Sequence, residues 1–292
     1  MHHKSAYDHL VKRPIIIIGA HRSGTTWLLR GLRQTPELAC LGEPRVIWVY
    51  RNWFKPDDVL TAKDARPAVV RYIRRRFAVE VRGAGKERLC EKTPSNALRI
   101  PFVKAVFPDA RIVLIVRDGR SVFRSTEQIK NAAPIEYARS LGQKLRATRV
   151  VEMPAYLSRL SVGVRKLLGR APAFWGAKPP GWREWVGQET PDRVVAKQWA
   201  GIMECSLRDL AALDDESYRI IRYEDVIRST REVMSPLMEF LEVKAPEDVV
   251  SFFESSARQD RIESWRNELP TATLEEIRPI MEPIMNQMGY QW

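Results

Sequence analysis

The sequence predicts an α/β fold, a P-loop-like three-layer arrangement in which helices flank a central parallel sheet. Residues 14–19 read P-I-I-I-I-G, and residues 110–116 read A-R-I-V-L-I-V. Runs that are apolar on both faces and rich in β-branched residues are typical of strands in the middle of a parallel sheet. Each run precedes a polar loop and a segment with apolar residues at helical spacing, which is the repeating unit of α/β proteins.

Further strands and helices alternate along the chain. Short strands are expected at residues 88–90 and 217–222. Helices are expected where apolar residues recur three and four positions apart, at residues 25–33, 97–107, 120–130, 192–213, 229–241, 247–258 and 273–288. Since we detect no internal repeat and no low-complexity tract, residues 1–292 are expected to form a single domain.

The composition is that of a globular protein with a basic surface. The chain has 292 residues, of which 45% are hydrophobic and 29% charged, and this excludes a disordered or collagen-like protein. A formal net charge of +12 favours anionic partners such as nucleotides, nucleic acid, acidic glycans or anionic lipid. The sequence has neither an apolar run long enough to span a membrane nor a secretory signal. We therefore expect a cytoplasmic protein, whose basic surface also suits peripheral contact with the inner face of the membrane.

The cysteines indicate no metal site. Cys40, Cys90 and Cys205 are an odd number at wide spacing, without a C-x-x-C pair, so neither a disulfide framework nor a zinc site is expected. A reducing compartment suits this pattern.

One basic segment interrupts the alternation of strands and helices. Residues 144–184 contain nine basic and two acidic side chains and end in a Pro- and Trp-rich stretch. Insertions in α/β enzymes often form lids or acceptor-binding elements. We therefore expect residues 143–190 to form a helical and loop insertion over the acceptor site, although its apolar stripe is equally compatible with core packing or membrane contact.

The loop after the first strand is a candidate phosphate site. Residues 19–26, G-A-H-R-S-G-T-T, keep the G-x-x-x-x-G spacing of a P-loop between a strand and a helix. Thr25 replaces the Walker lysine and the cation lies upstream at Arg22, so ATP with magnesium is a poor match. Backbone N–H groups at the helix N-terminus and the nearby hydroxyls still make an anion cradle.

With this loop the sequence resembles the sulfotransferases that use 3′-phosphoadenosine 5′-phosphosulfate (PAPS), most closely the bacterial and tyrosylprotein branch with an R-S-G-T-T loop. The resemblance implies PAPS as the only cofactor, 3′-phosphoadenosine 5′-phosphate (PAP) as its product, and no metal. It also implies that the loop holds the 5′-phosphosulfate. The residues concerned are Arg22, Ser23, Gly24, Thr25 and Thr26.

A second signature, residues 107–125, resembles the family's 3′-phosphate site. The resemblance implies that Arg117 and Ser125, eight residues apart, hold that phosphate. An arginine at the carboxyl end of a strand indicates a ligand crevice even without the family. Asp118 and Arg120 are expected to pair with each other.

Two C-terminal stretches extend the resemblance. The R-Y-E-D sequence at residues 222–225 resembles a family element in which the tyrosine, here Tyr223, contacts the cofactor. The segment around Trp265 resembles the nucleotide-capping segment, but Ser264 stands where a lysine is expected. Three arginines are open as substitutes: Arg258, Arg261 and Arg266.

The proposed chemistry needs a base and two cations. Sulfuryl transfer resembles phosphoryl transfer, which depends on positioned cations and a base for the incoming hydroxyl. Glu43 lies 21 residues after Arg22, where the tyrosylprotein enzymes carry their base, so the resemblance implies that role. A solvated glutamate paired with Arg45 is the alternative, and His21 is a rival base. Arg22 is also expected to stabilise the leaving oxygen.

Lys92 resembles the family's second catalytic cation, with a surface lysine as the alternative. The adjacent Glu91 is expected to be a structural partner. Cys40 and Cys90 occupy positions whose counterparts in the secreted-pathway enzymes lie close together. The resemblance therefore implies that these two cysteines approach each other.

The expected function is transfer of a sulfuryl group from PAPS to a hydroxyl of an acidic or glycosidic acceptor: a carbohydrate, glycolipid or small metabolite. A peptide tyrosine is the alternative acceptor. Two alternatives lie outside the sulfotransferase class. One is a nucleotide kinase. The other is a basic module that binds nucleic acid or membrane, and the V-R-Y-I-R-R-R-F run around Arg74 favours it. That run is more typical of a solvated helix face, so we expect no nucleic-acid partner.

Overall fold

The fold is built on a five-stranded parallel sheet. The computed structural model describes residues 8–132, 174 and 176–292, and in these ranges the strand order is β2-β3-β1-β4-β5, with every pairing parallel. The strands are β1 (Ile15–Ile18), β2 (Leu38–Gly42), β3 (Arg88–Lys92), β4 (Arg111–Val116) and β5 (Tyr218–Arg222). The predicted α/β fold is confirmed.

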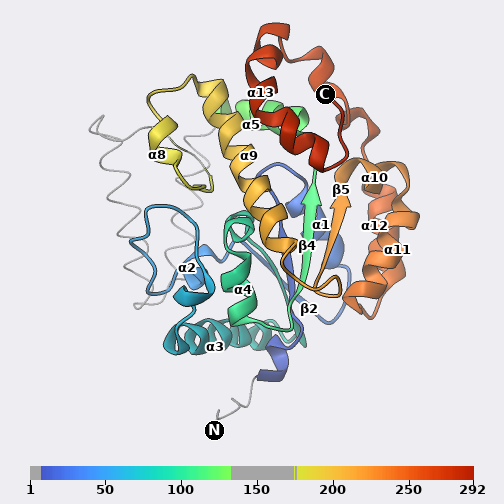
Figure 1. Cartoon of the computed structure of the whole chain (residues 1–292). Coiled ribbons are helices and arrows are strands. Elements are labelled where there is room, and N and C mark those ends of the chain that lie inside the picture. The colour runs from blue at the N-terminus through green and yellow to red at the C-terminus, as the bar shows by residue number, and fades with distance from the viewer. Residues whose placement is uncertain (1–7, 133–173, 175) are drawn as a thin grey trace.

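Helices cover both faces of the sheet (Figure 1). Since alternate residues of a strand point to opposite faces, Ile16 and Ile18 of β1 join one core and Ile15 and Ile17 the other. The first core includes α2 (Arg45–Trp48), α3 (Pro67–Gly83), α4 (Ile100–Val106), α5 (Gly119–Ala132), α9 (Pro191–Leu210) and α13 (Thr271–Gln287). The second includes α1 (Thr25–Leu32), α10 (Tyr223–Arg228), α11 (Thr230–Leu241) and α12 (Pro246–Ser256). None of the helices in the described ranges has the length and apolar character needed to cross a membrane.

The structure corrects three local predictions. Edge strand β2 was not predicted, because its sequence L-A-C-L-G lacks the β-branched residues that mark β1 and β4. Strand β3 extends two residues beyond the predicted 88–90, through Lys92. The helix expected at 97–107 is instead a 3₁₀ helix, Pro94–Leu98, followed by α4, and Arg99 between them has a non-helical backbone with φ of −151° and ψ of 36°.

The arginine-rich run lies in α3, with one face of the helix buried. Ile73 and Phe77 are fully buried, while Arg71 and Arg75 are exposed. The predicted solvated helix face is therefore confirmed for part of the run. Arg76 is the exception, since it is buried and pairs with Glu80.

Most of the predicted insertion lies outside the described residues. The structure describes residue 174 and, from residue 176, the end of the 143–190 segment, including α8 (Trp182–Trp185). This end is tied to the loop before α3: the indole N–H of Trp182 donates to the Pro56 carbonyl oxygen at 2.9 Å.

A buried carboxylate holds the turn after β3. The side chain of Glu91 is fully buried and accepts hydrogen bonds from the Thr93 hydroxyl and from Asn96 Nδ2, the latter at 2.9 Å. These contacts agree with the expected structural role of Glu91. Burial raises the pKa of Glu91 from 4.5 to about 7.

We predict that Glu91 makes the stability of the protein depend on pH. Because the raised pKa means that the native state binds the proton more tightly than the unfolded chain, this stabilisation is present below pH 4.5 and is lost as pH rises to about 7. The free energy of unfolding of the wild type should therefore fall, relative to that of Glu91→Gln, by at most about 1.4 kcal/mol per pH unit. Urea unfolding at pH 5, 6 and 7 measures this difference, and a constant difference across the three values would contradict the prediction.

Helix α1 packs closely on α12 through a glycine. A Cβ added at Gly31 would overlap the buried ring of Phe253. We predict that Gly31→Ala destabilises the protein by about 1–3 kcal/mol, the usual cost of overpacking a core.

Gly83→Ala is the matched control for this substitution. Gly83 ends α3, and no described atom lies within 4 Å of its added Cβ. The control should leave stability unchanged or raise it by up to about 1 kcal/mol, because alanine favours helix. Denaturant unfolding of both variants tests the packing, and equal losses would contradict it.

Candidate active site

The predicted site residues lie at one edge of the sheet, because all five strands run in the same direction. Strand β1 leads into the loop that carries Arg22, β2 into Glu43, β4 into Arg117 and β5 into Tyr223, while Lys92 is the last residue of β3. Segments far apart in sequence thus supply one candidate site.

The loop after β1 presents donors toward the N-terminus of α1. Arg22 and Gly24 have left-handed backbones, with φ of 69° and 100°. Glycine is required at position 24, because an added Cβ would lie 2.7 Å from Tyr223 Cδ2. Ser23 is fully buried, and its Oγ has no hydrogen-bond partner among the described residues. An unsatisfied buried hydroxyl beside first-turn N–H groups fits a bound anion.

Two arginines and a serine are joined beside this loop. Arg22 Nε donates to Ser125 Oγ at 2.9 Å, and Arg117 Nη1 donates to the Arg22 carbonyl oxygen at 3.2 Å. The Arg117 guanidinium lies over the Tyr223 ring at 4.4 Å. Its buried Nε has no partner in the part of the chain that is described. The structure therefore brings together the residues predicted for the two phosphate positions of the donor.

Positive charge accumulates at this point. Burial, with Arg117 and Arg261 nearby, lowers the pKa of Arg22. Across the described ranges, no ion pair links any of these three arginines to a carboxylate. Like charges held together without a counterion repel, so a ligand with several negative charges would stabilise the cluster.

The three C-terminal arginines differ in their partners. Arg258 pairs with Asp260 at 3.1 Å, and Arg266 pairs with Glu263 at 3.3 Å. Arg261 is exposed and its carbonyl oxygen accepts from Arg117 Nη2 at 2.9 Å. The geometry therefore singles out Arg261 among the arginines that the sequence left open.

Glu43 and Lys92 form an ion pair across two neighbouring strands. Lys92 Nζ lies 2.7 Å from Glu43 Oε1, and Glu43 N donates to the Lys92 carbonyl oxygen at 2.7 Å. The lysine side chain is 4% exposed, whereas the glutamate side chain is 37% exposed. Burial opposes ionisation of Glu43, but Lys92 and Arg45 outweigh it and hold its pKa below the usual value. The carboxylate is therefore ionised and accessible at neutral pH.

The pairing of β2 with β3 sets this arrangement. Gly42 lies opposite Lys92, and Cys40 lies opposite Cys90. The predicted approach of the two cysteines is thus confirmed, and both thiols are free.

His21 lies near the Glu43–Lys92 pair, since the charges of both residues act on its imidazole. Burial and the charge of Arg45 lower the pKa of His21 to about 4, so its imidazole is neutral at pH 7. An added Cβ at Gly176 would lie 3.0 Å from His21 Cε1. The end of the predicted insertion therefore reaches the neighbourhood of the Glu43–Lys92 pair.

Asp58 holds the described end of the 143–190 segment through hydrogen bonds to Lys178. Its backbone N–H donates to the Lys178 carbonyl oxygen, and Lys178 N donates to Asp58 Oδ2, both at 2.9 Å. Arg45 lies 3.7 Å from the same carboxylate. Neither Asp58 nor this contact was predicted from sequence, because the two segments are 120 residues apart.

The sequence reasoning also missed Trp27. This residue follows the R-S-G-T-T sequence in the first turn of α1, and that position was the available signal. Its indole N–H donates to Ser256 Oγ at 2.9 Å, and its ring meets the Tyr223 ring edge-on at 5.3 Å. The Trp27 and Tyr223 rings thus form an aromatic surface beside the anion loop, and a planar heterocyclic ring suits such a surface.

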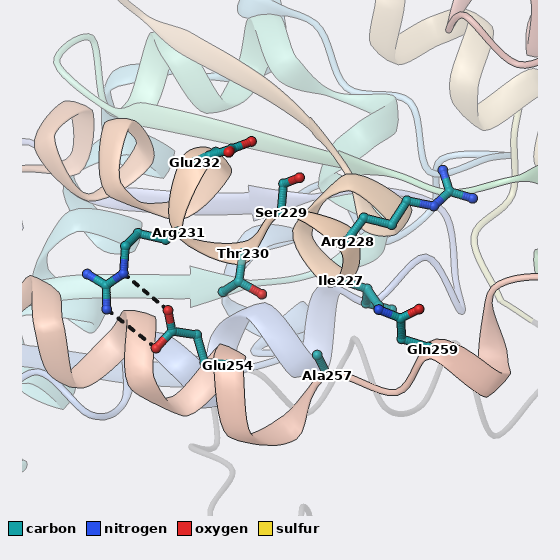
Figure 2. Close-up of a pocket in the computed structure, with 9 residues that line it drawn as sticks. All are labelled: Ile227, Arg228, Ser229, Thr230, Arg231, Glu232, Glu254, Ala257 and Gln259. Atoms are coloured by element: carbon teal, nitrogen blue, oxygen red, sulfur yellow. Dashed lines mark hydrogen bonds and ion pairs between the residues drawn. The ribbon is translucent and has the colours of Figure 1, made fainter.

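A surface hollow of about 500 Å³ lies next to the 3₁₀ turn Gln259–Arg261 (Figure 2). Arg231 on its wall is paired with Glu254. The lining includes Gln259 but none of the residues of the Glu43–Lys92 pair or the anion loop. The hollow is therefore separate from the Glu43–Lys92 pair and from the anion loop.

The chain is similar to proteins of a known family. The model of the Sulfotransferase family matches residues 14–163, just over half of the chain. A putative protein-tyrosine sulfotransferase of Caenorhabditis briggsae is 30% identical over 128 residues, 41% of this chain and 44% of that protein. The protein-tyrosine sulfotransferase of Drosophila melanogaster is 30% identical over 130 residues, 41% of this chain and 26% of that protein. The matches thus span less than half the length of these relatives.

Two solved structures are similar to this chain in fold. The sulfotransferase domain from the curacin biosynthetic pathway has a TM-score of 0.57 and 17% identity, covering 96% of this chain and 99% of that one. The sulfotransferase domain of the Synechococcus PCC 7002 olefin synthase has a TM-score of 0.55 and 16% identity, covering 98% of both chains. On the match of the family model, the chain belongs to the sulfotransferase family.

Proposed function

We propose that the protein transfers a sulfuryl group from PAPS to the hydroxyl of an acceptor. The observation that carries this proposal is the division of one sheet edge into two parts. An arginine cluster without carboxylate partners in the described ranges lies at β1 and β4, and an ionised glutamate paired with a lysine lies at β2 and β3. A donor with phosphates at two positions and an acceptor with one acidic proton suit these two parts.

The chain offers partners for each part of the donor. Ser23, the first-turn N–H groups of α1 and the hydroxyls of Thr25 and Thr26 suit the 5′-phosphosulfate. Arg117 and Ser125, with Arg261, suit the 3′-phosphate. Trp27 and Tyr223 suit the adenine. This assignment gives the two unpartnered buried atoms, Ser23 Oγ and Arg117 Nε, a ligand.

The proposed chemistry is in-line displacement at sulfur. The acceptor oxygen forms a bond to sulfur, the bond between sulfur and the bridging phosphate oxygen breaks, and the electron pair of that bond stays on the leaving oxygen of PAP. Glu43 takes the acceptor proton. Arg22 stabilises charge on the leaving oxygen, and Lys92 stabilises the sulfuryl oxygens.

We propose that the acceptor enters beside Glu43 and that the 143–190 segment covers it. Trp182 is an aromatic anchor at the described end of that segment, with Lys178 Nζ 5.0 Å and Arg183 Cζ 5.5 Å from its ring. Aromatic and cationic side chains there favour an acidic carbohydrate, glycolipid or small metabolite. A tyrosyl peptide is the second candidate, favoured by relatives that are named protein-tyrosine sulfotransferases.

Calorimetric titration with nucleotides tests the donor. We expect PAP to bind at least tenfold more tightly than adenosine 5′-phosphosulfate. The second nucleotide lacks the 3′-phosphate and would leave Arg117 without an anionic partner. ATP with magnesium should bind no better than adenosine 5′-phosphosulfate. Preference for ATP would overturn the proposal in favour of a kinase.

We predict that Glu43→Gln lowers the rate of sulfuryl transfer by about 10²–10⁴-fold, the usual contribution of a positioned base. PAP affinity should stay within about twofold, since Glu43 lies outside the arginine cluster. The assay is turnover of labelled PAPS with a tyrosyl peptide and with a panel of carbohydrates and glycolipids. Because the pKa of Glu43 is depressed in the free protein, the acidic limb of the wild-type profile of kcat/KM for PAPS, which reports the free enzyme, should lie below pH 4.5.

Glu239→Gln is the matched control. Glu239 is exposed on α11, away from the sheet edge. It should leave turnover unchanged. A Glu43→Gln variant as active as this control would rule out Glu43 as the base.

A further inference from the structure

The last residues of the chain contact the turn that carries Arg117. Tyr290 OH donates to Glu224 Oε2 at 2.6 Å, and the other oxygen of the same carboxylate, Oε1, accepts from the Asp118 backbone N–H at 3.0 Å. All three residues are buried. Glu224 is therefore a bridge between the end of the chain and the turn after β4.

A second tie runs through Arg120. Its guanidinium pairs with Asp118 at 2.7 Å, which confirms the predicted local pair, and donates to the Gln291 carbonyl oxygen at 3.0 Å. The same group lies over the rings of Trp265, at 4.0 Å, and Trp292, at 5.3 Å. We call residues 290–292, together with Glu224 and Arg120, the C-terminal clamp.

The clamp acts on residues that adjoin the donor site. Asp118 directly follows Arg117, and Gly119 begins α5, the helix that carries Ser125. Glu224 directly follows Tyr223, whose ring lies under the Arg117 guanidinium. The end of the chain and the arrowheads of β4 and β5 lie at the same end of the sheet (Figure 1). The clamp therefore contacts the residue directly after Arg117 and includes the residue directly after Tyr223.

Tyr290 is suited to a constant positioning role. Burial and the neighbouring Glu224 raise the pKa of Tyr290 far above its ordinary value, so the hydroxyl stays protonated and remains a donor at physiological pH. A short hydrogen bond from a neutral hydroxyl to a carboxylate is among the stronger kinds in proteins.

We propose that Tyr290, acting through Glu224, is a positioning residue of the donor site, which holds the turn after β4 so that Arg117 meets the 3′-phosphate. This inference rests on the proposed function. It assigns a role to residues 290–292, which contact Glu224, Arg120 and Arg222.

Tyr290→Phe is the test. It removes the hydroxyl alone and keeps the ring that lies 4.1 Å from the Arg222 guanidinium. We expect calorimetry to show about tenfold weaker binding of PAP, the effect of losing one buried hydrogen bond to a charged group. Binding of adenosine 5′-phosphosulfate should change less than twofold, because that nucleotide lacks the phosphate that Arg117 would hold.

Tyr218→Phe is the matched control, and Trp292→Ala is a second variant. Tyr218 begins β5 at the opposite end of that strand, so its replacement should leave PAP binding unchanged. Trp292→Ala removes one flank of Arg120 and should weaken PAP binding in the same selective way by a few fold. Trp292→Ala tests the positioning role of the clamp if the Tyr290→Phe variant does not fold.

The outcomes separate the two proposals. Folded variants that bind PAP as the wild type does, or that lose affinity equally for both nucleotides, would overturn the clamp and leave the proposed function intact. A wild-type protein that binds neither nucleotide would overturn the proposed function and, with it, the clamp.

Discussion

Parallel pairing of five strands is the constraint on which the site depends. A parallel sheet gathers the carboxyl ends of its strands at one edge, and here that edge receives Arg22, Glu43, Lys92, Arg117 and Tyr223. The register is equally important, since a one-residue slip reverses the direction of every side chain in a strand. With Gly42 opposite Lys92, the residue after β2 comes within hydrogen-bond distance of the lysine at the end of β3.

The parallel arrangement also brings several arginines close together, and their positive charges repel one another. Arg22 and Arg117 donate to serine and carbonyl oxygens, and no ion pair in the described ranges joins either of them to a carboxylate. The surrounding structure holds them in place: Tyr223 lies against one face of Arg117, and the carbonyl oxygens of Arg22 and Arg261 accept its N–H groups. Under the proposed function the donor supplies the missing negative charge, so the energy stored in repulsion contributes to binding.

Local sequence was enough to predict most of the sheet and the candidate residues, but not the contacts between distant segments. The isoleucines of β1 and the R-S-G-T-T loop identify a buried strand and an anion site, and the resemblance to the tyrosylprotein branch, which carries a glutamate at the same interval after the loop, leads to Glu43. Strand β2 was missed because L-A-C-L-G carries no strand signal of its own and is ordered by pairing with β3. Lys178 meets Asp58, and Tyr290 meets Glu224, across 120 and 66 residues. No local pattern encodes contacts over such separations.

Under the proposed function, the ion pair between Glu43 and Lys92 would keep Glu43 a weak base until the donor is bound. A carboxylate held 2.7 Å from an ammonium group is a weak base, because protonation would forfeit that attraction. The sulfuryl oxygens of a bound donor would compete for Lys92 Nζ. Under the proposed function, a lysine engaged by those oxygens would no longer stabilise the Glu43 carboxylate as strongly, and the basicity of Glu43 would increase when the sulfuryl group is in place. The same ion pair would thus restrain the base in the empty enzyme and supply the cation in the loaded one.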